Sequence, residues 1–301
     1  MTSQQLENTS LLEGSAAAGA PNERHQSEEE RIQQRDVVSP ADGTVVLQGF
    51  DSLANNNKSN DPYDLQWYCA PDAWNESEKG HGGAWELLSD SQLRLHPPAK
   101  KDFWRKTYYD PILIKDDGSV AYTTLDARQW YTITTNFTLT AVRQFDQAGI
   151  YLRLDADHWI KTGIEVVDHI PRLSVVVTNV YSDWSTQAWS DYSTEIKNDE
   201  KVTVVDCQLK LHARGNNFVV EAKQTQESLW SFVRISHLSR NIVCVDDPIQ
   251  VGQGEFQGPS PALGKMWAGV FAASPTDQQG CFVDFHDLRV VTGSSFEHSA
   301  D

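Results

Sequence analysis

The segment HWIKTGIEVVD, residues 158–168, has the period-two pattern of a β-strand. One face is an apolar row of the kind that packs on a core, and it comprises Ile160, Thr162, Ile164 and Val166. The opposite face comprises Trp159, Lys161, Gly163 and Glu165. An aromatic ring, an ammonium group and a carboxylate are groups that binding sites use. The segment therefore predicts a strand with a core face on one side and a functional face on the other.

Comparable β-rich runs follow one another along most of the chain, and no amphipathic helix of useful length separates them. The runs are residues 85–98, 129–142, 147–157, 172–185, 202–224, 228–238, 265–275 and 281–292. Within one of them, ARGNNF predicts a hairpin turn, because Gly215, Asn216 and Asn217 tolerate positive φ angles. Many strands without helices or internal repeats predict an all-β sandwich or barrel.

The composition predicts one folded domain between two disordered ends. Residues 1–38 contain no aromatic residue and include the acidic run Glu28–Glu30, so burial cannot offset the entropy cost of ordering them. We therefore expect a disordered acidic and polar tail over residues 1–38. A single β-sandwich domain is expected over residues 39–295, and a disordered C-terminus over residues 296–301.

The charge of the chain disfavours polyanionic partners. Acidic residues outnumber basic ones 42 to 25, which gives a formal net charge of −17. Such a balance repels phosphate backbones and anionic lipid surfaces, so we expect neither a nucleic-acid nor a membrane partner.

The cysteines and the first residues of the sequence predict a cytoplasmic location. No signal-peptide pattern and no apolar run long enough to span a bilayer is visible. The four cysteines, Cys69, Cys207, Cys244 and Cys281, form no CxxC pair. Without a secretion signal, we expect them to be reduced thiols.

Metal, cofactor and nucleophile motifs give no support to their respective chemistries. The nine histidines form no HxH or HExxH pair, and Asp155 with Asp157 or Asp246 with Asp247 is typical of turns. No GxSxG elbow is present. We expect neither a metal nor a cofactor.

Four consecutive segments instead concentrate aromatic, amide, acidic and basic side chains. A flat aromatic face with convergent donors and acceptors is how a sheet holds a polyhydroxylated ligand such as a carbohydrate. The alternative is that the tryptophans are core residues and the charged pair is structural. The predicted ligand-binding residues are Asp102, Trp104, Gln147, Tyr151, Trp159, Lys161, Glu165, Asn179, Asp183 and Trp184.

Glycoside cleavage is the enzymatic alternative. It requires two facing carboxylates, and the candidates are Glu165 as acid or base with Asp146 or Asp183 as its partner; Asp102 is also available. No Glu-x-Asp-x-x-Glu pattern is found, so the pairing stays open.

Four ordered motifs carry a family resemblance. They are DFWRKTYY from Asp102, DQAGIYLRLDADHWIKTGIE from Asp146, SVVVTNVYSDWS from Ser174, and GVFAASP followed by VDF from Gly269. Together they resemble a family of concanavalin A-like β-sandwich proteins of unknown function, which includes the budding-yeast "regulation of enolase" protein. The resemblance runs from about Trp67 to Val291. It implies a two-sheet concanavalin A-like jelly roll, a cytoplasmic protein in fungi, and no established enzymatic activity or agreed catalytic set.

Three functional hypotheses follow. The first, which we prefer, is a binding or regulatory module without enzymatic activity, whose concave groove accepts a carbohydrate-like or other polar ligand. The second is a glycoside hydrolase or lyase, and the third is a regulatory protein that acts through protein–protein contacts. Under the first hypothesis Lys161 and Glu165 line one groove with Gln147 and Trp159 and point away from the core. The expected partners of Lys161 are then Asp146 and Asp183.

Overall fold

The computed structural model describes residues 43–55, 61–73, 84–106, 110–197, 199–225, 229–239, 258–276 and 281–293, together with Phe296. The chain divides into two units, Met1–Ser39 and Pro40–Asp301, and every described residue belongs to the second. The predicted tail over residues 1–38 and most of the predicted C-terminus therefore lie outside the described residues. Phe296 is the exception, and its ring contacts those of His212 and Phe232.

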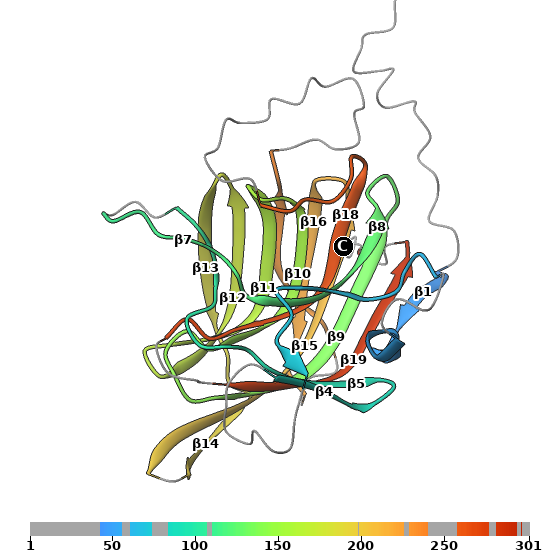
Figure 1. Ribbon diagram of the computed structural model, residues 1–301. Helices are drawn as coiled ribbons and strands as arrows, with labels where there is room; N and C mark the ends of the chain where they lie inside the picture. The colour runs from blue at the N-terminus through green and yellow to red at the C-terminus, as the bar shows by residue number, and fades with distance from the viewer. Residues whose placement is uncertain are drawn as a thin grey trace, which may run out of the picture. The chain divides into compact units, whose positions relative to one another are not determined.

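Two large sheets form the described part of the chain (Figure 1). The ten-stranded sheet has the order β17 (Ser231–His237), β16 (Asn217–Lys223), β15 (Glu200–Arg214), β9 (Tyr131–Ala141), β19 (Phe282–Thr292), β5 (Gln92–His96), β4 (Ala84–Ser89) and β3 (Asp72–Ala73), with β1 (Val45–Gln48) paired to β19 and β14 (Tyr192–Lys197) paired to β15. The seven-stranded sheet has the order β13 (Tyr181–Ala188), β12 (Ile170–Asn179), β11 (His158–Val167), β10 (Gln147–Asp155), β18 (Lys265–Ala273), β8 (Ser119–Asp126) and β2 (Gln66–Tyr68). One short 3-10 helix, η1 (Asp51–Asn55), follows β1.

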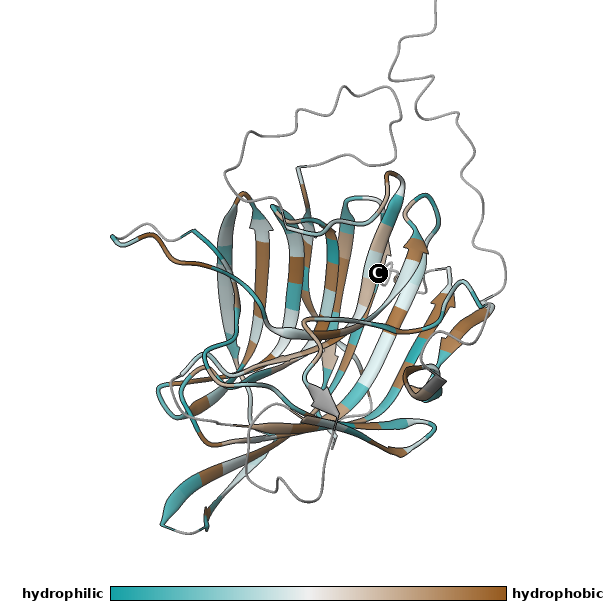
Figure 2. Cartoon of the chain, viewed as in Figure 1, coloured by the Kyte–Doolittle hydropathy of each residue, from teal (hydrophilic) through white to brown (hydrophobic). Residues whose placement is uncertain are grey.

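The main core lies between the two sheets. Strands of both sheets alternate in hydropathy, which appears as brown and paler or teal bands along them in Figure 2. The inward residues form one apolar cluster, which includes Ile160, Ile164 and Val166 of β11. This arrangement confirms the predicted all-β, concanavalin A-like two-sheet jelly roll and the predicted core face of residues 158–168.

The predicted runs form strands, although residues 85–98 and 172–185 each contain two strands, and the hairpin is confirmed. Arg214 and Asn217 are paired across a two-residue loop, and Gly215 there has a φ of 58°. Cys69, Cys207 and Cys281 are free thiols, and Cys244 lies outside the described residues. Within the described ranges, no helix has the length and apolarity that a bilayer crossing requires.

The outer face of the seven-stranded sheet, which is turned away from the main core, is partly covered by residues 99–118. We call this segment the strap; its residues 107–109 are not described. It contains the paired strands β6 (Phe103–Arg105) and β7 (Ile114–Asp116). Phe103 is fully buried, and its ring centroid lies 4.7 Å from that of Tyr151 and 6.2 Å from that of Trp159. The strap therefore creates a second, smaller apolar cluster on the outer face.

Three ion pairs fix the strap to the sheet. Two join its aspartates to the sheet, Asp102 to Lys161 and Asp116 to Arg153. A third joins Arg105 of the strap to Asp157. These contacts correct the prediction of a concave groove, because the strap occupies much of the face where the groove was expected.

Candidate functional site

Strand register brings the polar residues of the outer face together. Gln147 of β10 is paired with Glu165 of β11, and Gly163 of β11 is paired with Ser174 of β12. Lys161 lies two residues from Gly163 and therefore shares this face. Asp102 approaches from the strap. We call Asp102, Gln147, Lys161, Glu165 and Ser174 the polar cluster.

Lys161 is held by the strap and by β10. Its Nζ donates to Oδ1 of Asp102 at 3.1 Å and to Oε1 of Gln147 at 2.8 Å. Nε2 of Gln147 donates to the same Asp102 oxygen and to the carbonyl of Phe145, both at 3.1 Å. Because Lys161 is only 3% exposed, its charge needs this carboxylate to offset the cost of burial.

The predicted partners of Lys161 are wrong. The carboxylate of Asp146 accepts hydrogen bonds from the backbone N–H groups of Val142 and Arg143 and from the Ser274 hydroxyl. The exposed carboxylate of Asp183 accepts a hydrogen bond from Arg234. Both acids flank the cluster along the sequence, but neither is bonded to it.

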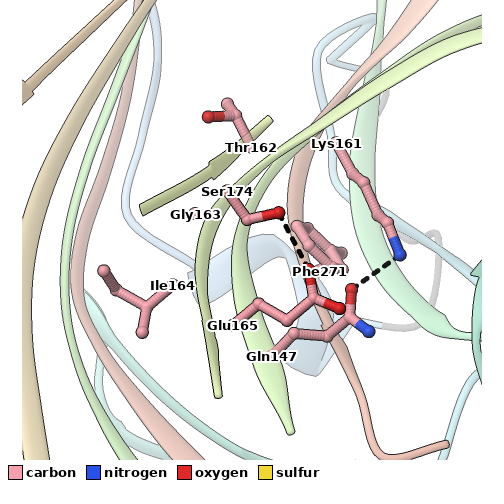
Figure 3. Close-up of a pocket in the computed structure, with 8 residues that line it drawn as sticks. All are labelled: Gln147, Lys161, Thr162, Gly163, Ile164, Glu165, Ser174 and Phe271. Atoms are coloured by element: carbon pink, nitrogen blue, oxygen red, sulfur yellow. Dashed lines mark hydrogen bonds between the residues drawn. The ribbon is translucent and has the colours of Figure 1, made fainter. Parts of the chain in front are cut away.

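Glu165 is linked to the surface through a serine. Oγ of Ser174 donates to Oε2 of Glu165 at 2.8 Å (Figure 3). Nε1 of Trp184 donates to the same Oγ at 2.8 Å. Burial raises the pKa of the Glu165 carboxyl, and the charge of Lys161 opposes this rise only in part. A carboxyl of this kind can donate a proton at a pH where an exposed glutamate is already ionised.

A narrow pocket lies among these residues, and it leaves no space for a water-sized sphere. In Figure 3 the side chains of Lys161, Gln147 and Glu165 converge in front of Phe271, while Ile164 and Thr162 point away from them. The lining residues are Gln147, Lys161, Thr162, Gly163, Ile164, Glu165, Ser174 and Phe271. Because the pocket has no room for a ligand, a ligand would lie across its mouth.

Three aromatic residues lie beside the polar cluster, and we call them the aromatic rim: Trp104, Phe145 and Trp184. The Trp184 ring meets the Trp104 ring edge-on at 6.3 Å between centroids and the Phe145 ring at 6.4 Å. Trp184 is 37% exposed and Phe145 is 36% exposed. Solvent-accessible aromatic surface therefore adjoins hydrogen-bonding groups, as a site for an amphipathic ligand requires.

Six of the ten predicted ligand-binding residues belong to this site: Asp102, Trp104, Gln147, Lys161, Glu165 and Trp184. Tyr151 and Trp159 are each 1% exposed, because Phe103 of the strap packs on them. Asn179 instead binds the backbone of His237 and Ser239.

The remaining predicted residue, Asp183, fails for a simple reason. It is adjacent to Trp184 on β13, and adjacent strand residues point to opposite faces.

Two contributors were missed by sequence reasoning. Ser174 begins one of the family motifs but was not among the predicted site residues. The alternation of its strand places it on the same face as Arg172. Phe145 directly precedes Asp146 and Gln147, which were predicted, but it lies outside the alternating pattern of the strand that follows.

Among the described residues, no group of three or more histidine, cysteine, aspartate or glutamate side chains is placed to hold a metal ion. The polar cluster has a lysine at its centre, which is not a metal-binding arrangement.

The fold and the site define a concanavalin A-like jelly-roll protein whose outer face carries a strap and a small aromatic and polar site. A family profile described as "Protein of unknown function (DUF1349)" matches residues 81–292, and the chain belongs to this family.

Similarity to Saccharomyces cerevisiae is found both in sequence and in a solved structure. Regulation of enolase protein 1 is 36% identical over 98 residues, which cover 33% of this chain and 48% of that protein. The match thus spans about half the length of the relative. The crystal structure of a functionally unknown protein aligns with a TM-score of 0.51 and 22% identity, over 77% of this chain and 97% of that one.

A xylan β-1,4-xylosidase from Bacillus halodurans aligns with a TM-score of 0.44 and 13% identity. The alignment covers 75% of this chain and 38% of the xylosidase. That score is too low to support a functional comparison.

Proposed function

We propose that the protein is a non-enzymatic binding module of the regulation-of-enolase type, whose ligand is a small polar molecule such as a carbohydrate. The observation that carries the proposal is the chain of hydrogen bonds from Trp184 through Ser174 to Glu165. It joins a partly exposed aromatic ring to a buried carboxyl group. The ligand would stack on the rim and present hydroxyl groups to the polar cluster.

The chemistry of the site suits hydroxyl groups. A carboxyl group, an ammonium group and an amide offer both donors and acceptors within one small area. Lys161 uses two of its three N–H donors within the cluster. Aromatic rings bury the apolar face of a sugar while its hydroxyls remain bonded.

A regulatory role and a cytoplasmic location belong to the same proposal. The similarity to Regulation of enolase protein 1 supports the regulatory role, although it spans only part of that protein. The free thiols Cys69, Cys207 and Cys281 suit a reducing compartment.

Calorimetric titration with a panel of mono- and oligosaccharides tests this function. The informative variant is Trp184→Ala, with Tyr181→Ala as its control, because Tyr181 is exposed and lies on the same strand. Loss of a stacking surface worth about 1.4 kcal/mol weakens binding about tenfold. The proposal fails if no sugar binds, or if Trp184→Ala binds as the wild type does.

Glycoside cleavage is a second candidate, and the buried carboxyl of Glu165 with its raised pKa favours it. The acid nearest in the cluster is Asp102, since Asp146 and Asp183 are engaged elsewhere. Release of nitrophenol from a set of aryl glycosides would support cleavage, provided that Glu165→Gln abolishes it. Release no faster than in buffer would reject it.

A further inference from the structure

Arg172 is a half-buried arginine on the outer face, directly beside the polar cluster. It is paired in register with Glu165, so the two side chains leave the sheet on the same side. No hydrogen bond or ion pair joins its guanidinium to any residue that the structure describes. Glu165 is instead bonded to Ser174.

This lack of a partner is unusual among the described arginines. Six of them bind a carboxylate, in the pairs Arg94–Asp284, Arg105–Asp157, Arg128–Asp126, Arg143–Glu200, Arg153–Asp116 and Arg234–Asp183. Arg214 lies over the ring of Trp130, and Arg289 is exposed to solvent. In a chain of net charge −17, acids are plentiful, yet no described carboxylate is bonded to Arg172 at the candidate site.

We propose that the ligand carries one anionic group, a carboxylate or a phosphate, which the guanidinium of Arg172 binds while the rest of the ligand lies on the aromatic rim. This inference rests on the proposed function. It narrows the ligand class to acidic sugars, either uronic acids or sugar phosphates. A guanidinium binds both anions through two parallel N–H donors.

The spacing of the site fits one sugar ring. Arg172 and Ser174 are two residues apart on β12, so their Cα atoms are separated by about 7 Å. The indole N–H of Trp184 reaches the Ser174 hydroxyl. The backbone positions that carry the anion site and the Trp184 contact are thus about one monosaccharide apart.

The charge of the whole chain restricts the ligand to a small anion. The net charge of −17 repels a polyanion over long distances. A ligand with a single anionic group still binds the guanidinium of Arg172, and it is repelled by the chain less than a polyanion is. Nucleic acids and sulfated polymers are therefore poor ligands.

The test is calorimetry at low ionic strength with three probes: glucose, glucuronate and glucose 6-phosphate. We expect the wild type to bind one or both anionic probes at least about tenfold more tightly than glucose, which corresponds to about 1.4 kcal/mol. Arg172→Gln should abolish this preference, because the anionic probes should then bind no more tightly than glucose does. Arg289→Gln removes the same charge from an exposed site on another sheet and should change nothing.

The outcomes separate the two proposals. If glucose binds and Trp184→Ala weakens it, but the anionic probes bind no more tightly, the proposed function stands and the anion site is wrong. Preference for the anionic probes that persists in Arg172→Gln also overturns the anion site. If none of the three probes binds, the anion site is wrong, and the wider sugar panel decides the proposed function. Arg172→Lys keeps the positive charge but lacks the two parallel N–H donors of a guanidinium. It should therefore retain only part of the preference for the anionic probes. This second variant tests the anion site even if Arg172→Gln folds poorly.

Discussion

Oδ1 of Asp102 accepts a hydrogen bond from Nζ of Lys161 at 3.1 Å, and this contact joins the strap to the centre of β11. The lysine belongs to the functional face that its strand predicts, and the aspartate belongs to a segment 59 residues earlier. Because the strap takes this lysine as its partner, the candidate site lies beside the strap, next to Glu165 and Trp184.

The strap is expected to be an integral part of the fold. Phe103→Ala removes a fully buried ring and should lower the free energy of unfolding by about 3–5 kcal/mol. Phe232→Ala, at a half-exposed ring on β17, is the control and should cost much less. Urea unfolding measures both, and equal stabilities of the two variants would mean that the strap is not docked.

The buried pair of Asp116 and Arg153 should be far more important than the exposed pair of Asp183 and Arg234. Asp116→Asn leaves the arginine charge buried without its counter-charge and should cost about 3–5 kcal/mol. Asp183→Asn should cost no more than about 1 kcal/mol, since an exposed pair is screened by solvent. Similar losses in the two variants in thermal unfolding would contradict the burial of Arg153.

Glu165→Gln should gain relative stability as the pH rises. Burial raises the pKa of Glu165 in the folded state, so above the ordinary glutamate value of about 4.3 the native state binds more protons than the unfolded state. The free energy of unfolding of the wild type then falls with rising pH through that window. The variant lacks this titration, so the stability difference should move in its favour between about pH 4 and pH 7.

The control for this titration is Glu195→Gln, at an exposed glutamate of β14. Its stability relative to the wild type should show little change over the same range. A Glu165→Gln variant that becomes progressively less stable toward neutral pH would show that the ionised carboxylate stabilises the fold.

Gly163 should not tolerate a side chain. A Cβ atom there would lie 1.9 Å from the carbonyl oxygen of Ala148 on the neighbouring strand, so the strands would have to separate. Gly163→Ala should therefore cost about 1–3 kcal/mol or more. Gly43→Ala meets only ordinary contacts at 3.7 Å and serves as the control. A Gly163→Ala protein with the melting temperature of the wild type would contradict the close approach of β10 and β11.

The fold was predictable from the sequence because the alternation of apolar and polar residues indicates each strand locally. The alternation over residues 158–168 correctly separates a core row from an outer row, and the Gly215 turn is marked by its own residues. The strap carries no such signal. Its strands β6 and β7 have three residues each, and the partners of Phe103 lie in distant strands.

The site was predictable only in part, since register and pairing are not visible in one sequence. Lys161 was assigned to acids near it in flanking segments, whereas the structure supplies the acid from the strap. Asp183 could have been excluded, because its neighbour Trp184 occupies the outer face. Arg172 and Ser174 can be assigned to the site only when the register of β12 against β11 is known.

The most direct test of the binding site is the set of indole N–H signals in a proton–nitrogen NMR spectrum, with Trp184 assigned through Trp184→Phe. During titration with glucuronate or glucose 6-phosphate, we expect the Trp184 signal to shift in a saturable manner. The signal of Trp159, which is buried under the strap, should remain in place. Saturable shifts at Trp159 with an unchanged Trp184 signal, or no saturable shift at any indole for either anion or for glucose, would contradict a binding site at Trp184.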